Sequence, residues 1–163
     1  MASTTQLFNP LTNDWSQPLL AAFHLPRRIF PAIVRAGTRL GCLLPELQKE
    51  TGLPAIDVIA TCSHDTGASV AAVPATGDDW AFLSSGTWSL IGVELAAPLI
   101  NEEVRAHNFT NERGYDGTTR FLKNIAGMWL LQECQRSCQR AGSSADHTAL
   151  SREADAAEPF RSL

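Results

Sequence analysis

A β-branched run that ends in a cluster of polar residues constrains the fold of this chain most strongly. Residues 56–62 (Ile-Asp-Val-Ile-Ala-Thr-Cys) follow Pro54 and lead directly into Ser-His-Asp-Thr at 63–66. Such a run predicts a buried strand, and the carboxyl end of a strand is where open α/β sheets place their ligands. The small residues at 66–74 then predict a helix that Pro74 stops. Strand, polar loop and helix together predict an α/β crossover unit.

A second local unit follows, in which two apolar segments flank a tight turn. Residues 80–84 and 87–95 surround Ser85-Gly86, and this arrangement predicts a β-hairpin. Hydrophobic periodicity and turn residues also predict a helix over 17–23, a bent strand or hairpin over 33–43, a helical turn over 44–51 that Gly52 ends, a polar connection over 97–117, a short strand over 118–122, and helices over 124–140 and 145–156. A boundary between two half-domains is expected at 74–79.

Length and charge limit the classes of function that remain. The 163 residues suffice for one sizeable core or for two small incomplete ones. Thirteen basic against seventeen acidic residues give a net charge of -4, which is the wrong sign for a duplex-binding surface. We therefore expect no nucleic-acid partner.

The apolar stretches and the cysteines indicate in which cellular compartment the protein is expected. The longest apolar stretches, 53–60 and 68–74, are far shorter than the ~20 residues that span a bilayer, so we expect no membrane contact. The first residues lack the basic start and apolar run of a secretory signal, which favours a cytoplasmic location. In a reducing compartment, and without a CxxC pair, we interpret all four cysteines as thiols: Cys42, Cys62, Cys134 and Cys138.

Asp65 is the strongest single candidate for chemistry. A carboxylate between a strand and a helix can accept a proton from a substrate hydroxyl, but Asp is also a favoured residue for capping a helix that starts at Thr66. Both roles stay open. Ser63, His64 and Asp65 do not form a nucleophile triad, because neighbouring side chains of an extended segment point to opposite faces.

A zinc site is not expected either. The histidines are scattered along the chain, and the cysteines four residues apart on the last long helix have no matching second pair. These residues are His24, His64, His107 and His147, with Cys134 and Cys138.

Two further features carry weak signals of their own. The turn at 84–87, Ser-Ser-Gly-Thr, has the small residues that let successive N–H groups surround phosphate oxygens, although most such turns are ordinary hairpins. It is not a Walker motif. Asn124 and Gln132 lie eight residues apart on the predicted helix, about 12 Å along its axis. Alone, they are typical of a helix-start Asn and a solvated Gln.

In combination, several sequence blocks resemble the FGGY carbohydrate kinases, and within that family the branch that phosphorylates L-rhamnulose. The resemblance runs from about residue 2 to residue 140. It is carried by residues 2–9 with Trp15, and by the blocks 63–66, 80–94, 108–112 and 122–132 in this order.

The resemblance implies an α/β fold of the actin-like, ribonuclease-H-like type, with ATP and sugar in a cleft between two lobes. Residues 1–74 would form the C-terminal part of the sugar-binding lobe, and residues 75–163 the truncated start of the nucleotide-binding lobe. The implied reaction transfers the γ-phosphoryl group of ATP to the 1-hydroxyl of L-rhamnulose. Mg²⁺ is implied by the nucleotide, without an assigned protein ligand.

The resemblance also implies roles for single residues. Asp65 matches the catalytic base and a sugar contact, beside further sugar contacts at His64, Thr66 and Asn124. Gly86 and Thr87 match the contact to the ATP phosphates, and Gln132 matches another ATP contact. One helix would then span both ligands.

The sequence departs from the family in what it lacks. Family members are much longer: they begin with a glycine-containing acidic phosphate loop and later carry a Gly-Gly adenine-binding segment, and neither is found in these 163 residues. We expect each lobe to lack strands and to expose sheet edges. The polypeptide alone is then expected to be a weak or inactive kinase, a truncated frame or one piece of a split gene whose other parts act in trans. A non-catalytic binding or assembly module, and a kinase for another ketose or polyol, are the alternatives.

Overall fold

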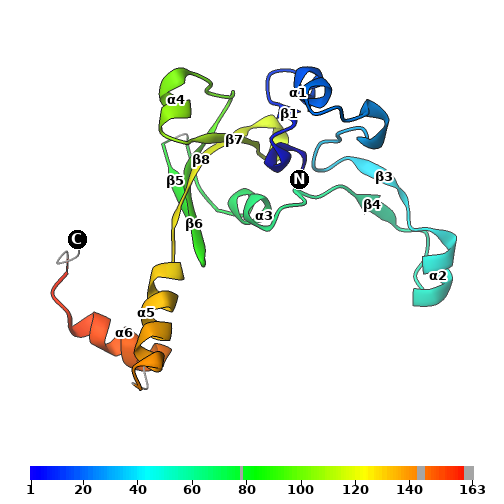
Figure 1. Ribbon diagram of the computed structural model, residues 1–163. Coiled ribbons are helices and arrows are strands. Elements are labelled where there is room, and N and C mark those ends of the chain that lie inside the picture. Colours follow the sequence, from blue (N-terminus) through cyan, green and yellow to red (C-terminus); the bar gives the residue numbers. More distant parts are fainter. Residues whose placement is uncertain (78, 143–145, 160–163) are drawn as a thin grey trace. The chain divides into compact units, whose positions relative to one another are not determined.

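The computed structural model describes residues 1–77, 79–142 and 146–159, and Figure 1 shows their helices and strands. By its internal contacts the chain divides into two compact units, Met1–Ser84 with Leu90–Asn124, and Ser85–Ser89 with Ile125–Leu163. The α-helices are α1 (Gln17–Ala22), α2 (Pro45–Thr51), α3 (Asp65–Ala71), α4 (Glu102–Ala106), α5 (Trp129–Arg140) and α6 (His147–Ala156). The strands are β1 (Phe8–Asn9), β2 (Asp14–Trp15), β3 (Arg39–Cys42), β4 (Asp57–Ile59), β5 (Ala81–Ser85), β6 (Trp88–Leu95), β7 (Thr110–Arg113) and β8 (Thr119–Ala126). Short 3₁₀ turns lie at Ala2–Thr5, Arg27–Ile29 and Tyr115–Gly117.

The largest sheet has four strands in the order β5-β6-β8-β7. Its small core joins Val70 of α3 to Phe82 and Leu122 of the sheet, and Leu122 is fully buried. Gly92 of β6 permits this packing, since a Cβ there would lie 2.7 Å from the Leu122 Cβ and 2.8 Å from the Phe82 ring. The predicted hairpin is confirmed as β5 and β6.

The segment predicted as a polar connection over 97–117 contains two regular elements, so that prediction is wrong. Asn101 caps α4, because its side chain accepts the Val104 N–H at 2.8 Å. β7 has no apolar alternation of its own and forms by antiparallel pairing with β8, in which Glu112 faces Arg120. The strand predicted at 118–122 is confirmed and extends to Ala126.

The N-terminal part of the chain forms small local structures. The predicted helix at 17–23 is confirmed as α1, whose Leu20 is buried. β1 pairs with β2, and the buried Trp15 donates its indole N–H to the Pro31 carbonyl at 2.8 Å. The predicted turn at 44–51 is confirmed as α2, which ends at Gly52 in the left-handed conformation (φ 71°).

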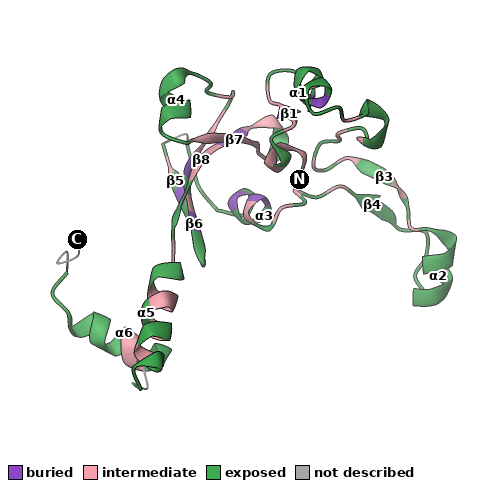
Figure 2. Cartoon of the chain, viewed as in Figure 1, coloured by how far each residue is buried: buried purple, intermediate pink, exposed green. Residues whose placement is uncertain are grey.

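The prediction of a buried strand over 56–62 is wrong. β4 is only three residues long and all three are exposed, as Figure 2 shows. It pairs antiparallel with β3, which lies within the bent strand predicted over 33–43 and has a register shift between Arg39 and Gly41. The crossover unit is therefore not formed as predicted. α3 nevertheless follows the polar cluster, beginning at Asp65 and ending three residues before Pro74.

The helix predicted over 124–140 begins only at Trp129, so its first part is wrong. Residues up to Ala126 continue β8, and Gly127 sits so close to the hairpin turn that a Cβ would lie 2.8 Å from the Ser89 backbone nitrogen. Close backbone packing at this glycine separates strand from helix.

The helix predicted over 145–156 is present as α6 from His147 onward, while Ala145 lies outside the described residues. No described helix is both long and apolar enough to cross a membrane.

Candidate functional site

Asp65 is the first residue of α3, and its side chain is 94% exposed. Its Oδ1 accepts the Thr66 N–H at 2.7 Å. The helix cap is His64, with no side-chain capping bond, so the alternative that Asp65 caps a helix beginning at Thr66 is wrong. A negative charge in the first turn is favoured by the helix dipole. Asp65 therefore presents an accessible carboxylate that is able to accept a proton.

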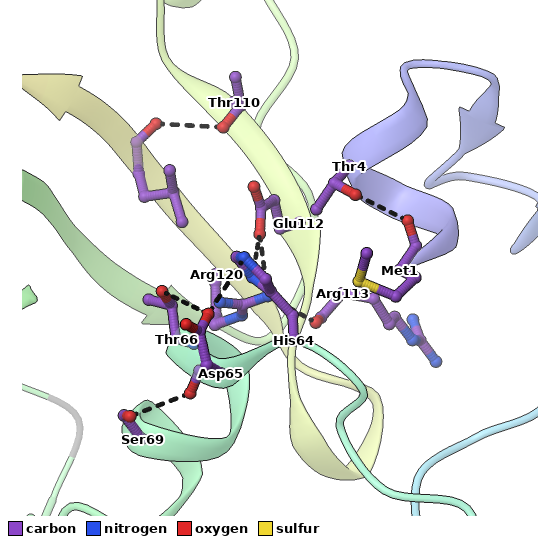
Figure 3. A network of polar contacts seen from close by, with 11 residues as sticks. Met1, Thr4, His64, Asp65, Thr66, Ser69, Thr110, Glu112, Arg113 and Arg120 are labelled. Atoms are coloured by element: carbon purple, nitrogen blue, oxygen red, sulfur yellow. Dashed lines mark hydrogen bonds and ion pairs between the residues drawn. The ribbon is translucent and has the colours of Figure 1, made fainter. Parts of the chain in front are cut away.

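His64 lies between Asp65 and Glu112 (Figure 3). Its Nε2 is 3.4 Å from Asp65 Oδ1, and its Nδ1 is 3.9 Å from Glu112 Oε2. The imidazole is largely buried, with 28% of the side chain exposed. Ser63 does not join this pair, because its hydroxyl donates to the Thr61 carbonyl at 3.2 Å.

The sequence does not predict the largely buried ion pair that lies beside His64. Arg120 Nη2 donates to Glu112 Oε2 at 2.9 Å, with 3% and 14% of the two side chains exposed. The guanidinium also lies against Gly67 of α3, where a Cβ would come within 3.2 Å of Arg120 Nη2. The pair thus anchors the first turn of α3, which carries Asp65. Glu112 belongs to a block that resembles the kinases, but no sequence signal revealed its pairing across β7 and β8.

The other predicted sugar contacts are placed differently. The Thr66 hydroxyl lies 3.5 Å from Asp65 Oδ1, so it shares the Asp65 site. Asn124 lies exposed on β8, not on a helix. The predicted single helix carrying both Asn124 and Gln132 is therefore wrong, and α5 carries Gln132 alone. The cause is the extension of β8 through the position where the helix was predicted to begin.

The second unit brings together the residues predicted to contact ATP. The carbonyls of Gly86 and Thr87 accept the Met128 and Trp129 N–H groups at 2.8 and 3.0 Å, which ties the turn to the start of α5. Gln132 Nε2 then donates to the Thr87 hydroxyl at 3.3 Å, across 45 residues of sequence. The Gly86 N–H is already used, since it donates to the Trp88 carbonyl at 3.1 Å. The Thr87 hydroxyl, the Gln132 amide of α5 and the hydroxyl of the exposed Ser85 are polar side-chain groups at this turn.

The last two features of the candidate site to consider are metal ligands and cysteine thiols. Within residues 1–77, 79–142 and 146–159 no group of three or more His, Cys, Asp or Glu side chains is placed to hold a metal ion. Mg²⁺ in nucleotide sites needs only one or two carboxylates, because phosphate oxygens and water complete its shell. All four cysteines are free thiols.

Comparison with known families shows to which family the chain belongs. A model of the N-terminal domain of the FGGY family of carbohydrate kinases matches residues 1–72, and a model of its C-terminal domain matches residues 81–162. This chain belongs to the FGGY family. The resemblance found in the sequence blocks is thereby confirmed.

Curated relatives of this FGGY chain carry the name rhamnulokinase. The protein from Bacteroides thetaiotaomicron is 51% identical over 100% of this chain and 33% of its own length. Those from Enterococcus faecalis and Bacillus subtilis are each 43% identical over 98% of this chain and 32% of their own. The chain spans about a third of the length of these relatives.

A solved structure supports the predicted fold class. The crystal structure of a carbohydrate kinase from Novosphingobium aromaticivorans matches 74% of this chain and 26% of its own, with a TM-score of 0.58 and 26% identity. The fold is α/β and is part of the actin-like fold of FGGY kinases, as predicted.

Proposed function

We propose that this chain is the central segment of an ATP-dependent kinase that phosphorylates the 1-hydroxyl of L-rhamnulose. The observation that carries the proposal is the identity of 43–51% to proteins named rhamnulokinase along almost the whole chain. Residues 1–74 would belong to the sugar-binding lobe and residues 75–163 to the nucleotide-binding lobe.

Asp65 acts as the general base in this proposal. As the sugar 1-oxygen attacks the γ-phosphorus, its proton passes to the exposed Asp65 carboxylate, and the bond to the bridging oxygen of ADP breaks. The 2.7 Å bond from the Thr66 N–H orients the carboxylate, and His64 contacts its Oδ1 from the buried side. His64 and Thr66, together with Asn124 on β8, are proposed sugar contacts.

Gly86, Thr87 and Gln132 are the proposed contacts to ATP. The hydrogen bond between the Gln132 amide and the Thr87 hydroxyl supports a shared role in ATP binding. It holds an amide and a hydroxyl, both able to donate to phosphate oxygens, close together near the start of α5. Mg²⁺ is the proposed metal and would neutralise charge on the nucleotide phosphates.

We propose further that the isolated segment is weak or inactive and that the remaining two-thirds of the kinase must be supplied. The β3-β4 ribbon supports this, since its apolar side chains Leu40, Val58 and Ile59 are 57%, 38% and 47% exposed. Such a ribbon is marginally stable until a partner covers it. The covering segments would come from the same gene product or from a second chain in trans.

A graft tests the proposal. The matching third of the Bacteroides thetaiotaomicron rhamnulokinase is replaced by this chain, and ADP release with L-rhamnulose is measured for the hybrid and for this chain alone. We expect turnover at ordinary kinase rates of ~1–100 s⁻¹ from the hybrid and little from the chain alone. A folded hybrid that releases no ADP with L-rhamnulose, but does so with another ketose or polyol, would reassign the substrate.

A further inference from the structure

The first unit contains a cavity of about 510 Å³ that the kinase proposal does not use. It is lined by the N-terminal residues, by residues 31–36 and 61–63, and by the segment that joins β7 to β8. This volume is within the usual range for sites that take small metabolites. Its walls mix apolar side chains, such as Trp15 and Val34, with charged ones.

The charged groups of the wall are mainly cationic. Arg35, Arg113 and Arg120 all line the cavity, against Asp116 as the one carboxylate among its described lining residues. Arg35 forms no ion pair with any residue that the structure describes. Arg113 donates at 2.6 Å to the neutral Asn13 amide oxygen, not to an acid.

Arg35 and Arg113 line the same cavity. Burial, and then the positive charge of Arg35, lower the pKa of the Arg113 guanidinium. Arg35 is exposed and Arg113 is half-buried, and an anion beside two like charges stabilises both. The arrangement therefore favours a negatively charged occupant.

Arg120 also lines the cavity, and two of its donors are buried without a partner in the described part of the chain. The residue is 2% exposed, and its Nη2 donates to Glu112 Oε2 at 2.9 Å and to the Arg113 carbonyl at 3.5 Å, whereas its Nε and Nη1 have no hydrogen-bond partner within the described part of the chain. Buried donors without an acceptor are costly, and native structures normally supply one. Arg120 is therefore not fully satisfied by Glu112 alone.

We propose that this cavity binds a small oxyanion, a phosphate or carboxylate group, through Arg35 and Arg113, with Arg120 adding positive charge behind them. Guanidinium forks match the planar or tetrahedral oxygens of both groups. The apolar wall would hold the uncharged body of such a ligand. Asp65 is not among the residues that line this cavity, and the inference does not depend on the kinase proposal.

Calorimetric titration of the 163-residue chain tests the proposal, with inorganic phosphate in one series and malonate in another at constant ionic strength. We expect saturable binding of at least one anion, and the one that binds identifies the ligand class. R35M and R113M should each weaken binding about tenfold or more, as expected for loss of a charge-assisted bond. R28M removes an exposed arginine that does not line the cavity, and it should leave the affinity for the anion unchanged.

Two results would overturn the proposal. One is the absence of saturable binding for both anions by a chain whose circular dichroism shows it folded. The other is binding that R35M and R113M leave as tight as in the unaltered chain. Arg35 and Arg113 are chosen for substitution because neither belongs to the ion pair of Glu112 and Arg120. Their replacement should therefore leave the chain folded, so that weaker binding reports the loss of an anion contact.

Discussion

The ion pair of Glu112 and Arg120 should be the most costly polar contact to break in the first unit. Only 14% and 3% of the two side chains are exposed, so the loss of one partner leaves the other poorly solvated. E112Q leaves the guanidinium buried without its anion, and such a change costs about 3–5 kcal/mol of unfolding free energy. Because whole domains are stable by only about 5–15 kcal/mol, this loss should be visible directly.

Urea unfolding followed by circular dichroism, applied to E112Q, R120M and the double variant, measures the effect. The double variant should be more stable than the sum of the single losses predicts, with a coupling of about 1–3 kcal/mol. The matched control is E102Q, which breaks an exposed pair with Arg105 on α4 and should cost no more than about 0.5 kcal/mol. If E112Q and E102Q cost the same, the buried pair does not anchor α3 as described.

Two further variants test the packing and the capping. G92A should destabilise the chain by about 1–3 kcal/mol, because the new methyl group would lie 2.7 Å from the Leu122 Cβ, and a midpoint unchanged in urea would show that β6 and β8 are not packed this closely. N101A removes the side-chain cap of α4 and should cost about 1 kcal/mol; hydrogen exchange should quicken at Val104, and unaltered exchange there would contradict the cap.

Sequence patterns predict the helices and strands whose formation depends mainly on residues close together in the chain. The β5-β6 hairpin needs only its tight turn, and α2 needs only a glycine at position 52 to end it. The exposed carboxylate at the start of α3 was likewise predicted from the polar cluster that follows the β-branched run. In each case the decisive interaction lies within a few residues of the pattern.

Long-range pairing decided the features that the sequence did not reveal. β7 exists because it pairs with β8, and the Glu112–Arg120 contact follows from that register. Asn124 was assigned to a helix because the apolar stripe of α5 appeared to extend back to it, whereas pairing in the sheet extends β8 to Ala126. The β-branched run at 56–62 indicated burial, yet β4 has only β3 as its partner strand among the described residues.

The central claim is that Asp65 removes the proton from the sugar hydroxyl. In the hybrid with the Bacteroides thetaiotaomicron rhamnulokinase, kcat for ADP release with L-rhamnulose is compared for the unaltered hybrid, for D65N, and for the control D155N on the exposed face of α6. D65N should lower kcat by roughly 10²- to 10⁴-fold while the KM for the sugar changes little, and D155N should change neither. A D65N hybrid that keeps the full kcat would contradict the assignment of Asp65 as the base.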